Sequence, residues 1–572
     1  MKNIIRFIKS SIRSFLPTEV RIIRESVYVD LMRFFGKTTK SITIKEFPVY
    51  PNGEVAFYKY PFLQVGRKKY FAQIYGTDFV TDVTVGKRAY VNYTSEILIG
   101  ELYSNTTCIK IGVDSVLPVS IINKETDDNK SSLNIKINDS ASFNLKGFKQ
   151  NRFHYLPISA NSKVNIKSDA DYIVGSPIAT KQDGIETNKK LVLSIFIDGL
   201  ASKVFENIEF ERLMPNTYKY FENGSLFFNC YANSNWTLPS VGSIFSGRYL
   251  INHKLYHPSN EVHIGDGYPI ISDYFKNNGY LTAQFCSNFR KSPAYNYSQG
   301  FDRTVYRHSM GCDEIITKSI EHLRAFSDRS NYLWLTLFET HHFLHGIPDI
   351  SNQIKTKLDL HGSCNDSAKS PFSSFDKKKS ELYLLEVQRI DFYLKILFDY
   401  IEDNYDDDEV VVAICSDHGK GYLDNDEHIL AEHRIQVPMF FKSSELKPER
   451  STSIIENIDF LPSLLQLSGI KFNEKIDGSS VFSKIPRKQY AISESFFPHD
   501  KYHAAVYSKS YCFYLESNEI LELIDDVNFQ DCSYVFVRKS DGFVEQKGDI
   551  STLTGDAVFY FDHIISHKNI SS

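Results

Sequence analysis

Four polar side chains that could carry chemistry stand at the ends of predicted strands or in the turns beyond them: Asp198, Thr237, Asp417 and His418. In open α/β sheets, ligands bind at the carboxyl ends of strands, so we expect these side chains to meet at one edge. Together they form an oxygen and nitrogen shell for one divalent ion, with Zn²⁺ or Mn²⁺ preferred, Mg²⁺ or Ca²⁺ as alternatives, and a second ion left open. Such an ion lowers the pKa of a hydroxyl and polarises a phosphoryl oxygen, so the set predicts metal-assisted nucleophilic attack.

Thr237 is the candidate nucleophile, and its surroundings allow two interpretations. It precedes Leu-Pro-Ser and a short apolar segment that ends in Ser-Gly-Arg at 246–248. A helix that begins here would direct unpaired N–H groups and the positive end of its dipole toward a phosphoryl or sulfuryl group. The alternative is an ordinary N-cap. The stretch alone favours the cap, whereas the carboxylates and the imidazole elsewhere in the chain favour the nucleophile.

Several histidines and asparagines are further candidates. His341 and His433 flank predicted strands and could contact the phosphoryl group, act as a general acid or bind a second metal. Weaker candidates for substrate contact are His342, His345, Asn235 and Asn288. For each of these residues, a purely structural role is the alternative.

The pattern of the chain indicates elements that would position these residues. From 188 to 484, apolar runs typical of buried parallel strands alternate with helical segments, which predicts a doubly wound, mostly parallel α/β domain. The expected strands are 191–197, 225–231, 281–288, 332–338 and 410–415. The expected helices follow Pro239 and cover 268–278, 313–326 and 378–400, with 359–377 as an inserted loop.

The remaining regions differ from this domain. Residues 41–187 show short alternating strands and polar turns, which predicts a β-rich, sandwich-like domain that binds glycan or, as we favour, supports the rest. Residues 485–572 predict a small C-terminal β subdomain. Residues 1–40 have nine basic and three acidic residues, a net charge of +6, and an amphipathic helix is predicted within 1–16. That helix either packs on the protein or makes peripheral membrane contact.

Composition limits the classes of function. A chain of 572 residues is too long for one core, and a formal charge of −5 gives no reason to expect nucleic acid as a partner. The eight cysteines include no CxxC pair, so reduced core thiols are expected instead of a zinc-thiolate or redox site. No secretory signal or spanning apolar run is apparent. We therefore predict a cytoplasmic protein, at the inner membrane surface if the basic helix binds lipid.

Three motifs resemble those of the alkaline phosphatase/sulfatase superfamily. They are Ile-Phe-Ile-Asp-Gly at 195–199, Trp-Thr-Leu-Pro-Ser at 236–240 with Ser-Gly-Arg at 246–248, and Ser-Asp-His-Gly at 416–419. The segments 279–283, 300–302 and 437–441 resemble further family segments, so the resemblance covers about 189–480. It implies that Asp198, Thr237, Asp417 and His418 bind the metal.

The residue at the nucleophile position departs from the sulfatase pattern. True sulfatases have Cys or Ser in Cys/Ser-x-Pro-x-Arg, which is oxidised to formylglycine, whereas this chain has Thr237 and, at the Arg position, Val241. Thr cannot give formylglycine, so sulfate ester hydrolysis is disfavoured. Thr at this site resembles the phosphoglycerol and phosphoethanolamine transferases and also some phosphatases and phosphodiesterases of the superfamily, which implies a covalent phospho-threonine. In two-metal members the positions of His341 and His345 hold an Asp and a His, whereas in single-metal transferases a His here contacts the phosphoryl group.

The leading hypothesis is therefore a metal-dependent transferase. It would move a phosphoethanolamine, phosphoglycerol or O-methyl phosphoramidate type of group from an activated donor, such as a CDP-linked one, onto a glycan such as capsular polysaccharide. A phosphodiesterase or phosphatase of the same fold is the alternative, with water as acceptor. A non-catalytic glycan-binding protein is the third hypothesis, which the intact set of four polar residues disfavours.

Overall fold

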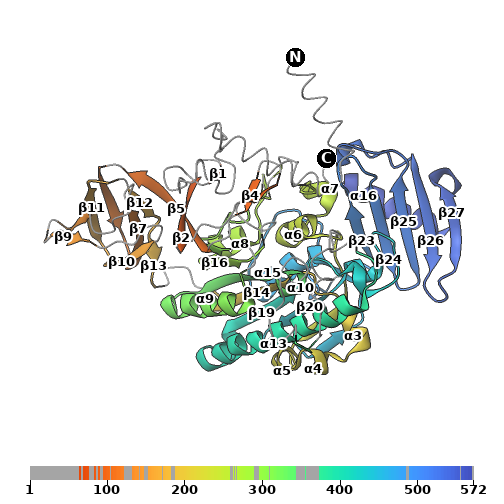
Figure 1. Cartoon of the computed structure of the whole chain (residues 1–572), viewed down its shortest axis with the longest axis horizontal. Coiled ribbons are helices and arrows are strands. Elements are labelled where there is room, and N and C mark those ends of the chain that lie inside the picture. The colour runs from red at the N-terminus through yellow and green to blue at the C-terminus, as the bar shows by residue number, and fades with distance from the viewer. Residues whose placement is uncertain are drawn as a thin grey trace, which may run out of the picture.

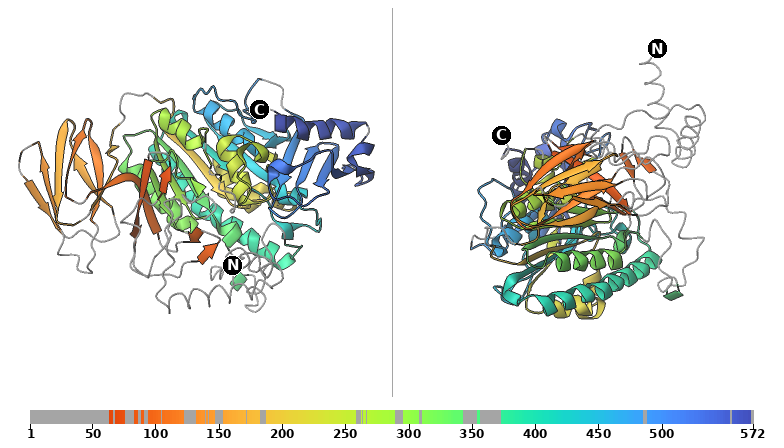
Figure 2. Two further views of the ribbon diagram at one scale, coloured as in Figure 1. Left: turned by 90° about the horizontal axis from the view of Figure 1, so that it is seen from above. Right: turned by 90° about the vertical axis from the view of Figure 1, so that its left-hand side faces the viewer.

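The computed structural model describes residues 94–121, 132–146, 153–181, 187–257, 262–288, 295–342, 354–355, 373–484 and 488–569, with gaps of one or two residues, and short strands between 63 and 90. The predicted helix within 1–16 and most of the predicted loop 359–377 lie outside the described residues. Figure 1 shows three parts side by side: an N-terminal β region, a central α/β part and a C-terminal sheet. Figure 2 shows that they follow one another along the long axis.

A large mixed sheet forms the centre of the molecule, as the alternating pattern predicts. Its central strands, in spatial order, are β16 (Leu281–Cys286), β18 (Asn331–Leu337), β14 (Leu191–Ile197), β19 (Val410–Cys415), β20 (Gln436–Lys442) and β15 (Ser225–Tyr231). The first four are parallel neighbours, and β20 pairs antiparallel with both β19 and β15. All seven residues of β14 are buried, which is the reason for its continuous apolar sequence.

Helices cover both faces of this sheet (Figure 1). One face packs against α6 (Thr237–Ser246), α8 (Ile271–Asn277) and α15 (Phe460–Leu467). The other packs against α9 (Cys312–Ala325), α13 (Lys377–Asn404) and the short α3 (Val204–Asn207), α4 (Phe210–Leu213) and α5 (Pro215–Tyr220). The doubly wound α/β architecture is confirmed, with boundaries shifted by a few residues. The largest shift in the site region is at α6, which begins at Thr237 and not after Pro239.

The N-terminal region contains two packed sheets, as predicted for a sandwich. One is four-stranded, in the order β6 (Thr106–Ile111), β11 (Ser162–Ser168), β8 (Leu133–Ile137) and β9 (Ser142–Leu145). The other contains β5 (Thr94–Tyr103), β12 (Tyr172–Gly175), β7 (Ser115–Ile121) and β10 (His154–Ile158). Apolar side chains of both sheets share one core.

The connection of this region to the central sheet was not predicted. β5 pairs antiparallel with β17 (Arg303–Tyr306), which is parallel to β16, so one continuous sheet runs through both parts. Alternation along a strand reports which face is buried but not which strand is its neighbour. At the junction, the fully buried Glu96 pairs with Arg303 and accepts a hydrogen bond from Tyr155.

The C-terminal sheet is antiparallel and five-stranded, which confirms the predicted β character of this region. Its strands are β23 (Tyr490–Ser495), β24 (His503–Ser508), β25 (Tyr511–Ser517), β26 (Cys532–Arg538) and β27 (Val544–Asp549). α16 (Asp556–Asn569), which was not predicted, contributes apolar side chains to the core of this sheet. The seven described cysteines are free thiols, as expected. Among the described helices, none has the length and apolar character needed to cross a bilayer.

Candidate metal and nucleophile site

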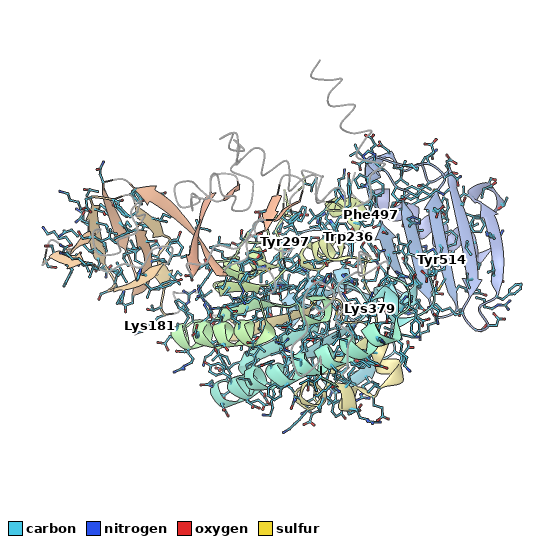
Figure 3. All side chains as sticks on the ribbon, viewed as in Figure 1. Lys181, Trp236, Tyr297, Lys379, Phe497 and Tyr514 are labelled. Atoms are coloured by element: carbon cyan, nitrogen blue, oxygen red, sulfur yellow. The ribbon has the colours of Figure 1, made fainter. Side chains whose placement is uncertain are left out.

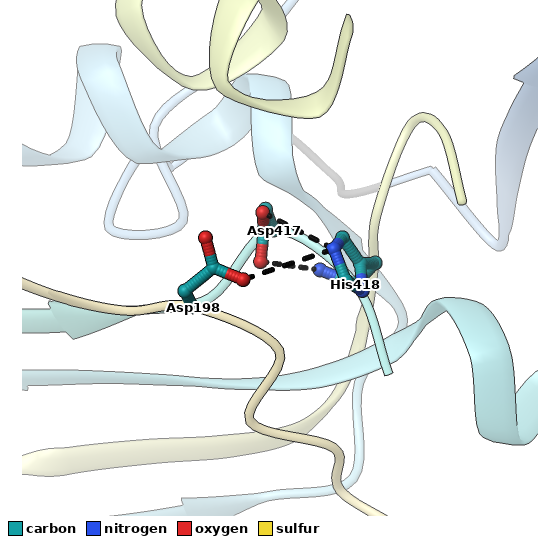
Figure 4. Close-up of side chains that lie close together, drawn as sticks. All are labelled: Asp198, Asp417 and His418. Atoms are coloured by element: carbon teal, nitrogen blue, oxygen red, sulfur yellow. Dashed lines mark hydrogen bonds and ion pairs between the residues drawn. The ribbon is translucent and has the colours of Figure 1, made fainter. Parts of the chain in front are cut away.

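Three of the four predicted metal-binding residues come together at the carboxyl ends of neighbouring parallel strands. Asp198 follows β14, and Asp417 and His418 follow β19, the adjacent strand. One ligand atom from each residue lies within 4.8 Å of the others, and all three side chains are buried (Figure 4). Adjacent parallel strands end at the same edge of a sheet, so the fold itself brings these residues together.

The hydrogen bonds of His418 define which ring nitrogen faces the cluster. Its Nδ1 lies 2.7 Å from the carbonyl oxygen of Gly419. A carbonyl can only accept, so Nδ1 carries the proton and the lone pair is on Nε2. Nε2 lies 3.4 Å from Oδ2 of Asp417 and 3.9 Å from Oδ1 of Asp198. Burial is the largest cause that lowers the pKa of His418, which favours the neutral, metal-binding form of the ring.

The hydrogen bonds of the Asp417 carboxylate indicate whether a cation fits at the cluster. Its Oδ1 accepts hydrogen bonds from the amides of Gly199, at 2.9 Å, and of His418, at 3.0 Å. Its Oδ2 is buried and accepts no hydrogen bond from any residue that the structure describes. A buried carboxylate oxygen without a donor is costly unless a cation balances it. Two carboxylates and an imidazole lone pair directed at one point therefore fit a single divalent cation.

Thr237 lies at this cluster and is not an N-cap. The N-cap of α6 is Trp236, which has extended backbone angles and makes no side-chain capping bond, and Thr237 is the first helical residue. Its Oγ1 lies 3.3 Å from Nε2 of His418. The side chain is almost fully buried, at 5% exposure. The N-cap hypothesis is wrong. The Thr237 hydroxyl instead lies next to His418 at the N-terminus of α6, where the helix dipole is positive.

Residues from distant parts of the chain hold Asp198 and the turn after it in place. Asn288, after β16, donates to Oδ2 of Asp198 at 2.6 Å, and Thr340 donates to the carbonyl oxygen of Asp198. The hydroxyl of Tyr383 on α13 accepts from the amide of Ala201 at 2.9 Å and donates to the carbonyl of Gly199 at 2.8 Å. Asn288 was only a weak candidate, and Tyr383 was missed because no local pattern connects α13 with the turn after β14.

Lys420 is a buried cation at the site that sequence analysis missed. Gly199 has a φ of +73°, and a Cβ atom there would lie 2.3 Å from Nζ of Lys420. The ammonium therefore lies against the turn that begins with Asp198, and the positive φ of Gly199 favours glycine there. Lys420 also contributes to the lowered pKa of His418. Its position directly after Asp-His-Gly was the available signal.

The histidines after β18 are only partly described. The ring of His341, in α10 (Glu339–His342), stacks on Phe338 with centroids 4.7 Å apart. It lies 6.4 Å from the ring of His418, so it borders the cluster. The side chain of His342 and the whole of His345 lie outside the described residues. Their predicted roles, and that of His341 in catalysis, stay predictions.

The segment before β20 carries two more candidates. His433, in α14 (Glu432–Ile435), accepts the amide of Lys420 at 3.1 Å through its carbonyl oxygen, so the two segments lie side by side. Burial is the largest cause that lowers the pKa of His433 to about 4. Asn235 donates to the carbonyl of Ile429 at 2.9 Å and thereby joins the start of α6 to the same segment. Substrate or proton-transfer roles for His433 and Asn235 remain predictions.

An aromatic pair stands beside the candidate nucleophile. Trp236 stacks on Phe497 of the C-terminal region, with centroids 5.0 Å apart and planes 20° apart, and His257 lies 6.1 Å from Phe497. Both members of the stack are half-buried. In Figure 3 the two labels lie where the central part meets the C-terminal sheet. Sequence analysis did not find Phe497, which lies 260 positions after Thr237.

A known protein family is similar to the part of the chain that contains this site. Residues 190–470 match the Sulfatase family model. The match contains all four residues of the predicted metal shell, and it confirms the expected superfamily at the level of the fold.

Solved structures of low sequence identity share the fold. A phosphonate monoester hydrolase from Silicibacter pomeroyi is 14% identical, with a TM-score of 0.50 over 68% of this chain and 96% of its own. A putative sulfatase, yidJ, from Bacteroides fragilis is 14% identical, with a TM-score of 0.51 over 68% and 98%. Ps i-CgsB in complex with k-i-k-neocarrahexaose is 15% identical, with a TM-score of 0.50 over 68% and 94%.

Proposed function

We propose that the protein is a metal-dependent transferase that moves a substituted phosphoryl group onto a glycan through a phosphorylated Thr237. The observation that carries the proposal is the position of the Thr237 hydroxyl, 3.3 Å from Nε2 of His418 at the start of a buried helix. Threonine is a competent oxygen nucleophile once its proton is removed, and it cannot be converted to formylglycine. A threonine at this position of a sulfatase-like fold therefore favours phosphoryl transfer over the hydrolysis of a sulfate ester.

The residues of the site have distinct roles in this proposal. Asp198, Asp417 and His418 would hold the metal, which when bound lowers the pKa of the Thr237 hydroxyl and neutralises charge on phosphoryl oxygens. Thr237 releases its hydroxyl proton to water, a bond from its Oγ1 to phosphorus forms, and the bond from phosphorus to the donor's leaving oxygen breaks. The acceptor oxygen then bonds to the phosphorus of phospho-threonine and loses its proton to water, and Oγ1 is released and takes up a proton. The dipole of α6 and the Lys420 ammonium favour the anionic group throughout.

The proposal extends to the substrates. The transferred group is of the phosphoethanolamine, phosphoglycerol or O-methyl phosphoramidate type, and a CDP-linked cytoplasmic donor supplies it. The acceptor is a sugar hydroxyl of a glycan such as capsular polysaccharide. The stacked rings of Trp236 and Phe497 support this part, because they offer a flat apolar surface next to the nucleophile.

Hydrolysis is the second candidate function. Water can resolve a phospho-threonine as well as a sugar hydroxyl can, and every residue named above serves both reactions. The fold shared with a phosphonate monoester hydrolase favours keeping this alternative. The two functions differ in the final acceptor, which product analysis identifies.

Metal analysis combined with intact mass spectrometry tests the proposal. The purified protein is incubated with CDP-ethanolamine and CDP-glycerol in the presence of Zn²⁺ or Mn²⁺, and a mass increase equal to the substituted phosphoryl group is expected. Thr237→Val, which keeps the shape but lacks the hydroxyl, should bind metal and form no adduct, whereas Thr237→Ser should retain it. Addition of an oligosaccharide should discharge the adduct onto sugar.

Two outcomes would count against the proposal. Undiminished turnover in Thr237→Val would exclude the covalent route. An adduct that only water removes, with no phosphorylated sugar from any acceptor, would replace the transferase with the hydrolase.

A further inference from the structure

The outer face of the four-stranded N-terminal sheet has an unusual distribution of charge. Alternation along β6, β11, β8 and β9 turns one set of side chains inward and the other outward, and exposure follows that alternation in the first three strands. The outward set consists of Thr106, Cys108, Lys110, Asn134, Lys136, Ser142, Asn144, Lys163, Asn165 and Lys167. Four are lysines and the rest are neutral, and none of the four strands contains Asp or Glu. We call this surface the lysine face.

The register places the lysines close together. Lys110 and Lys163 are directly opposite each other on neighbouring strands. Lys136 is opposite Asn165, which puts it diagonal to both Lys163 and Lys167. Side chains directly opposite are about 5 Å apart at Cβ and diagonal ones about 7–8 Å, and like charges directly opposite destabilise a sheet.

Three of the four lysines lack a carboxylate partner within the described part of the chain. Lys110, Lys163 and Lys167 form no ion pair with any described residue, although Lys and Arg elsewhere in the protein form many. The protein as a whole has a net charge of −5, so the positive charge here is local. An external anion would remove the repulsion between Lys110 and Lys163.

We propose that the lysine face binds an anionic polysaccharide. The charges extend over three strands and, between Lys163 and Lys167, about 13 Å along β11, which suits a polymer better than a single small anion. Asn134, Asn144 and Asn165 lie on the same face as the lysines, and their amides donate to and accept from sugar hydroxyls. The face has no Arg and no outward aromatic ring, the side chains that nucleic-acid surfaces use for phosphate forks and base stacking.

The lysine face is separate from the metal cluster. In Figure 1, β9 and β11 lie at the end of the molecule opposite the C-terminal sheet, with the central part between them. A polymer held there would be retained without occupying the reacting centre. That this polymer is also the acceptor rests on the proposed function, but its binding does not.

Affinity measurements on the full chain test the proposal. The probe is polygalacturonate, a carboxylate-bearing glycan, with neutral dextran and single-stranded oligothymidine for comparison. A face variant changes Lys110, Lys136, Lys163 and Lys167 to Gln, and a matched control changes four exposed lysines elsewhere, Lys447, Lys471, Lys509 and Lys547. We expect the native protein and the control to bind polygalacturonate in a salt-sensitive manner, and the face variant to bind roughly tenfold or more weakly.

Folding is monitored in the same series. Because the substitutions remove like-charge repulsion, the melting temperature of the face variant at low salt should equal or exceed that of the native protein. Lys163→Gln alone should also weaken the binding of polygalacturonate, by a smaller factor than the face variant does. Thr237→Val should bind polygalacturonate like the native protein, so failure of the proposed chemistry and failure of this site are distinguishable.

Several results would overturn the proposal. These are no binding by the native protein, equal binding by the native protein and the face variant, an equal loss in the matched control, or equal binding of neutral dextran. Tighter binding of oligothymidine through the same lysines would identify a nucleic-acid surface instead.

Discussion

At the scale of single residues, the site depends on a chain of orienting hydrogen bonds. The carbonyl of Gly419 selects the tautomer of His418, and that tautomer directs the Nε2 lone pair at the carboxylates and at Thr237. The amides of Gly199 and His418 occupy one oxygen of Asp417 and leave the other for a cation. Because these groups are buried, loss of a hydrogen-bond partner would lower the free energy of unfolding.

Asp417→Asn should stabilise the metal-free protein and destabilise the metal-bound protein, each relative to the native sequence. In metal-free protein, loss of a buried negative charge beside Asp198 should raise stability by about 1–2 kcal/mol. With saturating Zn²⁺ or Mn²⁺, the native protein should gain about 4 kcal/mol at a concentration near a thousand times Kd, and the variant should lose most of that gain. Melting curves with and without a chelator measure both effects.

Asp407→Asn is the matched control, because the Asp407 side chain is 82% exposed. It should leave both melting temperatures unchanged. If chelation lowers the melting temperature of Asp417→Asn as much as that of the native protein, Asp417 does not bind the metal.

At the scale of elements, each functional side chain belongs to a connection and not to a strand or helix interior. β14 and β19 end at the predicted metal-binding residues, and the turn after β15 leads directly into α6 with Thr237 as its first residue. The C-terminal sheet adds a second wall, since Phe497 follows β23 and stacks on Trp236. The candidate nucleophile therefore lies close to the place where the central part meets the C-terminal sheet.

Phe497→Ala should weaken acceptor binding more than chemistry. Loss of one ring of the stack removes contact energy of roughly 1–2 kcal/mol, which corresponds to about a five- to thirtyfold rise in KM for an oligosaccharide acceptor. The kcat and the adduct on Thr237 should change little. Steady-state kinetics with varied acceptor measure the two parameters separately.

Phe543→Ala provides the comparison, because Phe543 is an exposed ring of the same C-terminal region, at 56% exposure. It should leave KM unchanged. Equal KM values for both variants and the native protein would remove the aromatic pair from the substrate site.

At the scale of the whole molecule, one strand joins the N-terminal sandwich to the central sheet. β12 pairs with residues 100–103 of β5 and β17 pairs with residues 95–97, so the two regions share a sheet and not only a linker. Glu96 and Arg303 face each other across this junction, the former fully buried. The sheet that carries the lysine face packs on the sheet that continues into the central α/β part.

Glu96→Gln should destabilise this junction. Removal of one partner from a buried pair leaves the Arg303 charge uncompensated, at a cost of about 3–5 kcal/mol. Urea unfolding should show the loss, and hydrogen exchange should place increased opening at β5 and β17. Lys190→Gln is the control, because Lys190 pairs with Glu409 while 58% exposed, and it should cost less than about 1 kcal/mol. Equal midpoints for both variants would contradict a stabilising role of the buried pair.

Local sequence was sufficient to predict the elements that carry the chemistry. The apolar run before Asp198 and the motif Ser-Asp-His-Gly at 416–419 mark strand ends, and their residue types predict a metal site, because buried strands and metal ligands have local compositional signatures. Thr237 was identified as the candidate nucleophile by the same means, although the first turn of its helix was placed too late.

Only the tertiary structure decided which distant residues complete the site. Tyr383, Lys420 and Phe497 approach Gly199 or Trp236 from segments that no periodicity relates to them. The pairing of β5 with β17 could not be predicted from the sequence either. Periodicity records whether a side chain is buried, whereas the identity of its neighbour depends on how whole elements pack. The sequence by itself thus determined the chemical groups at the ends of the strands, and the packing of the elements determined which other residues surround them.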